Sequence, residues 1–213
     1  MVAGMYGMFF LGALYLQKVL GFDSLEVGLA FIPVTAIIGT LSLGFSAKLN
    51  LRYGAKATLV PGLVFVAAGL ALFSRITLDG SYWTEVLPAM VLIGLGAGLS
   101  FPSVMTLAMT GVRPQEAGLA SGLVNTTLQV GGALGLAVLA TLSTSRTASL
   151  VHGGEGAHAA LTSGYRLAFL VGAGLVIGAV AVAITVLRTG PAADEAAAAE
   201  AAEREPAFSS EAA

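Results

Sequence analysis

The chain has 213 residues, of which 56% are hydrophobic and only 10% charged, and its mean hydropathy is +0.88. Soluble globular proteins carry about 25% charged residues, so this composition excludes an ordinary water-exposed surface and predicts that lipid surrounds most of the chain. The net charge of −2 gives no basis for a nucleic-acid partner, and the lack of cysteine excludes disulfides and thiolate metal sites.

Six long segments contain no Asp, Glu, Lys, Arg or His, and they cover residues 1–17, 27–47, 57–74, 86–110, 117–142 and 167–187. A bilayer span needs about 20 apolar residues, and the backbone inside lipid must be helical to satisfy its own hydrogen bonds. The sequence therefore predicts an all-α membrane protein with a bundle of six transmembrane helices over residues 1–188. The Ala/Glu-rich segment 189–213 is expected to be a disordered cytoplasmic tail.

The first segment, 1–17, lacks a basic n-region and a small-residue cleavage site, so we interpret it as a span and not as a signal peptide. Because it begins at Met1, the sequence suggests a chain that lost, or never had, preceding residues. Its Met and aromatic side chains suit a promiscuous apolar pocket, but they equally suit lipid contact or ordinary packing. Tyr6 and Phe9 are the candidates for a substrate cavity.

The loop at 48–56 is the most basic of the loops, with Lys48, Arg52 and Lys56. Loops rich in Lys and Arg stay in the cytoplasm, so this loop and both termini are expected on the cytoplasmic side of the plasma membrane.

Segment 86–110 contains Gly94, Gly96 and Gly98, followed by Pro102. The glycine spacing resembles part of a nucleotide-binding fingerprint, but no strand precedes it, as that motif requires. In a membrane helix, glycine and proline instead indicate a close helix crossing and a kink. The kink is either a moving joint in a transport cycle or a static bend.

Segment 117–142 places five residues on one narrow face at 100° per residue, namely Gly118, Gly122, Asn125, Gln129 and Gly132. The glycines allow close approach of a neighbouring helix. The two amides cannot face lipid without unsatisfied hydrogen bonds. They either line a water-filled cavity where a substrate forms hydrogen bonds, or they bond to a neighbouring helix.

The third and sixth segments have few polar side chains and are expected to face lipid. Residues 143–166 are expected to form a long outer loop in which His152 and His158 are solvent-exposed and hold no metal. No cofactor is expected. The spans offer no nucleophile–base pair and no metal ligands, so an enzyme is the least favoured class.

Three stretches resemble a known family. Residues 9–33 and 111–142 resemble the first helix-loop-helix and the penultimate helix of the carboxyl-terminal half of drug:proton antiporters, in the fourteen-helix branch of the major facilitators. Residues 44–59 are similar to the Gly-and-basic loop of these transporters, but the usual acidic residue is missing and Asn50 lies nearby. The resemblance covers about residues 1–188.

This resemblance implies half of a major facilitator fold, built from two inverted three-helix repeats with the first, second, fourth and fifth helices lining a central cavity. It implies an amino-terminal transporter half as partner, a small-molecule substrate, and proton-coupled efflux of amphipathic drugs. Two alternatives remain open: a non-transporting membrane scaffold or regulatory bundle, and a half-size transporter acting as a homodimer.

Overall fold

The computed structural model describes residues 1–78 and 80–186, and every regular element in these ranges is a helix. The tail expected at 189–213 lies outside the described residues. In chain order the helices are α1 (Val2–Lys18), α2 (Ser24–Ala30), α3 (Ile32–Thr40), the π-helical turn η1 (Leu41–Phe45), α4 (Ser46–Tyr53), α5 (Ala55–Phe73), the π-helical turn η2 (Tyr82–Val86), α6 (Leu87–Met109), the 3₁₀ turn η3 (Pro114–Glu116), α7 (Ala117–His152) and α8 (Ala157–Val186).

Several of these helices join into longer membrane-spanning elements. The helices from α2 to α4 form one apolar element of 30 residues, Ser24–Tyr53, and η2 continues into α6 as Tyr82–Met109. Within the described residues, five elements are long and apolar enough to cross a bilayer, and α1, with 17 residues, supplies the sixth expected span. The all-helical fold class predicted from the sequence is confirmed.

Local sequence signals set where the second span begins and ends. Asp23 and Glu26 form a reciprocal capping box, in which Asp23 Oδ1 accepts from the Glu26 N–H at 2.7 Å and Glu26 Oε2 accepts from the Asp23 N–H at 2.9 Å. At the other end Gly54 has φ of +85°, a conformation that residues with a Cβ rarely adopt. This glycine separates α4 from α5.

The expectation of a long loop at 143–166 is wrong. Helix α7 continues to His152 and α8 begins at Ala157, so only residues 153–156 connect them. From Ser143 to His152 the sequence contains no Gly or Pro that would end the helix. Thr147 supports the continuation, because its Oγ1 donates to Ser143 O at 2.9 Å and to Ala160 O at 3.2 Å, which joins the two helices.

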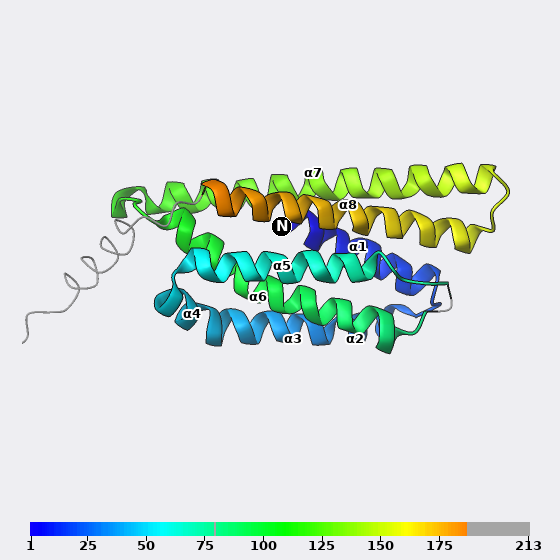
Figure 1. Cartoon of the computed structure of the whole chain (residues 1–213), viewed down its shortest axis with the longest axis horizontal. Helices are drawn as coiled ribbons and strands as arrows, with labels where there is room; N and C mark the ends of the chain where they lie inside the picture. Colours follow the sequence, from blue (N-terminus) through cyan, green and yellow to red (C-terminus); the bar gives the residue numbers. More distant parts are fainter. Residues whose placement is uncertain (79, 187–213) are drawn as a thin grey trace, which may run out of the picture.

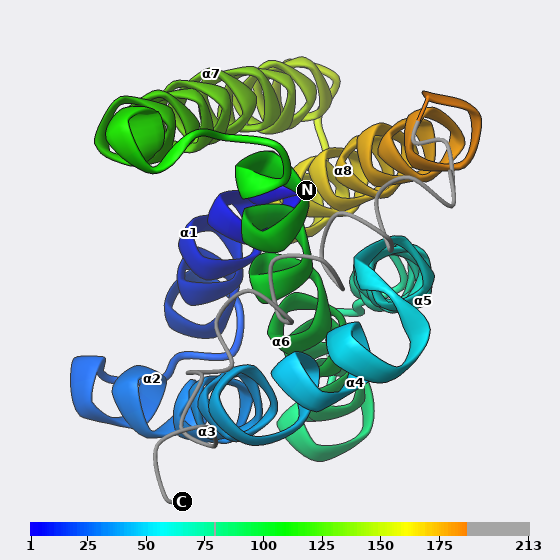
Figure 2. The same cartoon turned by 90° about the vertical axis from the view of Figure 1, so that its left-hand side faces the viewer.

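The helices run roughly along one axis, and the α7–α8 hairpin projects beyond the others at one end (Figure 1). Viewed along the axis, α1 is recessed between α7 and α2, while α5 and α8 cover the opposite side and α6 lies between the two sides (Figure 2). The recessed side presents the first, second and fifth spans, and the third and sixth spans lie away from it.

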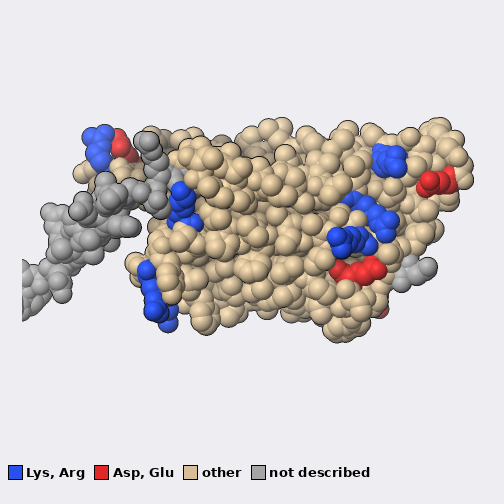
Figure 3. All heavy atoms as spheres, viewed as in Figure 1, with Lys and Arg blue, Asp and Glu red and all other residues tan. Residues whose placement is uncertain are grey.

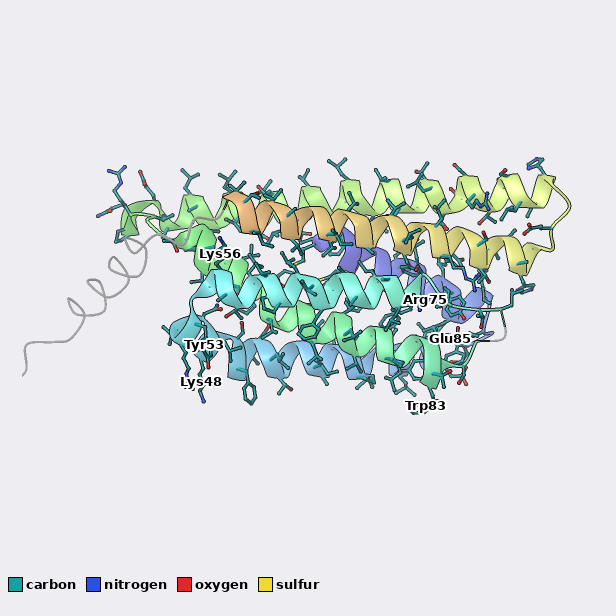
Figure 4. The ribbon with its side chains drawn as sticks, in the orientation of Figure 1. Lys48, Tyr53, Lys56, Arg75, Trp83 and Glu85 are labelled. Carbon is teal, nitrogen blue, oxygen red and sulfur yellow. The ribbon has the colours of Figure 1, made fainter. Side chains whose placement is uncertain are left out.

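Charged side chains gather at the two ends of the bundle. On the face shown in Figure 3, the band between the ends has no Lys, Arg, Asp or Glu among the described residues. Lys48 and Lys56 lie at one end, here named the α4 end, and Arg75 and Glu85 lie at the other, named the α2 end (Figure 4). The uncharged band is the part that fits the hydrocarbon core of a bilayer.

Helix α6 packs closely against two neighbours by using glycines on opposite faces. A Cβ at Gly96 would lie 2.6 Å from Val66 N of α5. A Cβ at Gly94 would lie 3.2 Å from Val34 O of α3, and one at Gly98 would lie 2.7 Å from the Leu41 Cβ. The alternating glycines therefore allow α6 to contact α5 and α3 at once, backbone to backbone.

Candidate functional site: a polar pair beside an apolar cavity

A hydrogen bond joins α1 and α7 on the recessed side of the bundle. Tyr6 Oη donates to Gln129 Oε1 at 2.6 Å. The approach depends on Gly132, which is buried, because a Cβ at that position would lie 2.6 Å from the Tyr6 ring. Gly132 thus permits the ring of Tyr6 to approach α7 closely while its hydroxyl group reaches the amide of Gln129.

This pair retains unused hydrogen-bonding capacity. Both side chains are exposed, and Asn125, one helical turn before Gln129, is exposed as well. An amide has two N–H donors and one carbonyl acceptor, and the Tyr6 hydroxyl engages only the acceptor of Gln129. The structure therefore brings Tyr6 and Gln129 together, and it leaves donors available on the open side of the bundle.

Phe9 has a different environment from Tyr6. Its ring stacks on Phe31, with centroids 5.3 Å apart, and it is only partly buried. Phe31 lies between α2 and α3, so this contact fixes α1 against the second span. Phe10, by contrast, is 48% exposed. Of these aromatic side chains of α1, Phe10 is therefore exposed, whereas Phe9 packs against the second span.

An apolar cavity of about 390 Å³ lies between α1, α7 and α8. Its lining includes Phe10, Leu14, Ala140 and Tyr165. Two hydroxyl groups in its wall bond within the protein: Thr144 Oγ1 donates to Ala140 O at 3.0 Å and Thr147 Oγ1 donates to Ser143 O at 2.9 Å. The volume falls in the usual range for small-molecule pockets, and the wall offers mainly carbon surface.

Pro102 breaks the hydrogen-bond ladder of α6, and the second span compensates. A proline has no N–H, so the Gly98 carbonyl loses its intrahelical donor. Ser42 Oγ donates to this carbonyl at 3.4 Å, and Ser46 Oγ donates to Leu99 O at 3.3 Å. Whether this joint moves stays a prediction.

Asn50 is a third polar residue that contacts α6, and it lies closer to the α4 end than Ser42 and Ser46 do. Ser103 Oγ donates to Asn50 Oδ1 at 2.9 Å, and Asn50 Nδ2 donates to Thr106 Oγ1 at 3.5 Å. An uncharged contact therefore lies near the position where the transporters that the sequence resembles are expected to have an acidic residue. Ser42 and Ser46 were not predicted as functional residues, although their spacing of four residues, continued by Asn50, puts all three on one helix face.

The other candidate residues are less closely packed. A Cβ added at Gly118 or Gly122 would meet no atom within 4 Å, so their role in helix packing stays a prediction. Lys48 and Arg52 are exposed on α4, and Lys56 Nζ donates to Ile184 O of α8 at 3.2 Å.

His152, the last residue of α7, and His158, in the first turn of α8, are exposed, as expected. Within residues 1–78 and 80–186, no three His, Cys, Asp or Glu side chains gather in a way that would hold a metal ion.

An all-helical bundle with apolar spans, charges at both ends and a polar pair on a recessed face is a multi-pass membrane protein. The family model described as Major Facilitator Superfamily matches residues 1–136. The chain belongs to this superfamily, whose members move small molecules across membranes.

Its relatives carry names that refer to antibiotic resistance and export. It is 38% identical over 200 residues to the puromycin resistance protein pur8 of Streptomyces alboniger, covering 90% of this chain and 40% of that protein. It is 37% identical over 179 residues to the cephamycin export protein CmcT of Amycolatopsis lactamdurans, covering 84% and 35%. The tetracenomycin C resistance and export protein of Streptomyces glaucescens is 34% identical over 142 residues, covering 66% and 26%. The chain thus spans less than half the length of these relatives.

Proposed function

We propose that this chain is the carboxyl-terminal half of an exporter of amphipathic small molecules in the plasma membrane. The recessed face of α1, α2 and α7 pairs with an amino-terminal half and encloses a site between the two halves. The observation that carries this proposal is that α1 and α7 present the exposed polar side chains of Tyr6, Asn125 and Gln129 and, further along the same two helices, the walls of an apolar cavity. An amphipathic molecule needs both kinds of surface.

In this proposal a proton gradient drives export, and the side chains that relay the protons lie in the amino-terminal half. A proton relay within a membrane requires ionisable side chains, typically Asp, Glu or His. The six uncharged segments of this chain contain none of them. The α4 end faces the cytoplasm, because Lys48, Arg52 and Lys56 lie there. Efflux that persists in the presence of an uncoupler would refute proton coupling.

Single-cysteine labelling of the full-length transporter tests the cavity. This chain has no cysteine, so once any cysteine of the amino-terminal half is replaced, Asn125→Cys and Gln129→Cys each introduce a unique thiol. Both are expected to react with a charged, membrane-impermeant thiol reagent, and puromycin is expected to slow the reaction. Ile177→Cys is the matched control, because Ile177 is 60% exposed on α8, away from the recess, and lipid is expected to protect it.

The labelling pattern separates the two interpretations of the amides. Protection of Asn125→Cys and Gln129→Cys from both sides of the membrane would mean that these positions pack against protein, and it would contradict the cavity. Reaction at Ile177→Cys with the same rate would show that the bundle is solvated on all sides, which also contradicts it.

The polar pair is tested by export measurements. Tyr6→Phe removes only the hydroxyl group that bonds Gln129, and a net hydrogen bond contributes about 0.5–1.5 kcal/mol, which corresponds to roughly a 2–10-fold loss of export. Tyr53→Phe is the control, because Tyr53 is exposed at the α4 end. If Tyr6→Phe and Tyr53→Phe export at the same rate, Tyr6 does not contribute to the site.

Expression of this chain alone distinguishes the proposal from a half-size transporter. Cells that contain only the six-helix chain are expected to retain puromycin or a fluorescent dye as long as cells without it. Efflux from such cells would support the homodimer instead.

A further inference from the structure

A small basic surface lies at the α4 end, at the junction of α4 and α5. We define it by Lys48 and Arg52, one turn apart on α4, and by Lys56 in the first turn of α5. Lys48 and Arg52 are exposed, and the Arg52 guanidinium lies over the Tyr53 ring, 5.4 Å from its centroid. Figure 4 shows Lys48 and Lys56 at the same end of the bundle.

The acidic side chains of the described residues do not neutralise this surface. Glu116 forms its ion pair with Arg113. Glu85 accepts from the Thr77 N–H and hydroxyl at the α2 end, where the capping box of α2 also lies. The described part of the α4 end therefore carries a net positive charge (Figure 3).

The sequence supplies the opposite charge in the segment that follows α8. Residues 189–213 contain six of the twelve acidic residues of the chain and a single basic residue, Arg204. The end of α8 lies close to the basic surface, because Lys56 Nζ donates to Ile184 O, two residues before Val186. The segment's first acidic residue, Asp194, follows Val186 by eight residues, which reach roughly 26 Å when extended.

We propose that the acidic segment 189–213 binds the basic surface of Lys48, Arg52 and Lys56 on the same molecule. Each exposed ion pair is weak by itself. The covalent connection to α8 raises the local concentration of the carboxylates into the millimolar range, so several weak pairs hold the segment in place. The contact links the last helix of the bundle to the α4–α5 junction, and salt weakens it because the pairs are exposed.

Distance measurement between two spin labels on the full-length protein in lipid nanodiscs tests this contact. This chain has no cysteine, so once any cysteine of the amino-terminal half is replaced, Ala47→Cys beside the basic surface and Ala198→Cys in the acidic segment carry the labels. In phosphatidylcholine nanodiscs we expect a population with short label-to-label distance. Lys48→Gln with Arg52→Gln is expected to lower this population about threefold or more, and high salt is expected to have the same effect.

The matched control neutralises two cations elsewhere. Arg75→Gln with Arg146→Gln removes the same charge from outside the basic surface and is expected to leave the distances unchanged. A short-distance population that is absent, or that survives neutralisation of Lys48 and Arg52, would overturn the proposal. The short-distance population could also disappear at ordinary salt when phosphatidylglycerol replaces part of the lipid. That result would mean that the basic surface binds anionic lipid, and it would also overturn the proposal. None of these outcomes depends on export activity.

Discussion

The crossing of α5 and α6 gives a sharp test of the structure through Gly96→Ala. A methyl group at Gly96 would lie 2.6 Å from Val66 N and 2.7 Å from Val66 Cγ2, and it would also contact Gly62 O. Two of these neighbours are backbone atoms, which cannot rotate away. The helices must therefore separate by roughly 1 Å to restore an ordinary contact of 3.4 Å to Gly62 O, the nearest of these atoms.

The expected cost follows from the behaviour of overpacked interiors. Inserting one carbon into a closely packed site costs about 1–3 kcal/mol. The Gly-to-Ala change also alters helix propensity, so a second glycine is needed as reference. Gly178→Ala on α8 serves this purpose, because a Cβ there would meet no atom within 4 Å. The difference between the two variants isolates the packing cost, which we expect to be about 1–3 kcal/mol.

The assay is reversible unfolding in mixed detergent micelles titrated with dodecyl sulfate. We expect Gly96→Ala to unfold at lower dodecyl sulfate than Gly178→Ala, with the free energies of unfolding differing by the amount given above. Equal free energies for the two variants would refute the reasoning, because they would mean that α5 and α6 do not cross at Gly62 and Gly96 with backbones in contact.

Three further substitutions test other contacts by the same unfolding assay or by proteolysis. Asn50→Ala removes the bridge to Ser103 and is expected to lower the free energy of unfolding by about 1 kcal/mol, whereas an unchanged value would mean that the bridge contributes nothing. Glu85→Gln weakens the acceptor for Thr77 and is expected to speed cleavage of the α5–η2 connection, and an unchanged cleavage rate would contradict this role. Gly54→Ala forces a Cβ into a positive-φ conformation and is expected to cost about 1–3 kcal/mol, so a neutral effect would argue against the turn.

The spans were predictable because the membrane imposes one strong requirement on composition. Uncharged stretches of sufficient length must be helices, and this placed all six. The boundary error at 143–166 has a definite cause. The end of an apolar run marks where a helix leaves lipid, and it does not mark where the helix ends, so α7 continues to His152 with polar residues that bond its own backbone.

The candidate site was predictable only in part. The pattern of α7 identified Gln129 as a polar residue that needs a partner, but it could not name Tyr6, which is 123 residues away in sequence. Likewise the sequence placed Asn50 near a missing acidic residue, but its contact with Ser103 depends on how α4 and α6 pack together. Contacts between segments distant in the chain leave no local pattern.

The sequence by itself determined that this protein is embedded in a bilayer, which stretches cross the bilayer and which residues cannot face lipid. These conclusions need no tertiary structure, because hydrophobicity and helical period are properties of each segment alone. The tertiary structure decided which helices touch: that Gly94 and Gly98 face α3 while Gly96 faces α5, and that Tyr6 rather than another donor meets Gln129. Between helices in lipid no hydrophobic force selects partners, so close packing of small residues and individual hydrogen bonds make that choice, and these depend on the whole bundle.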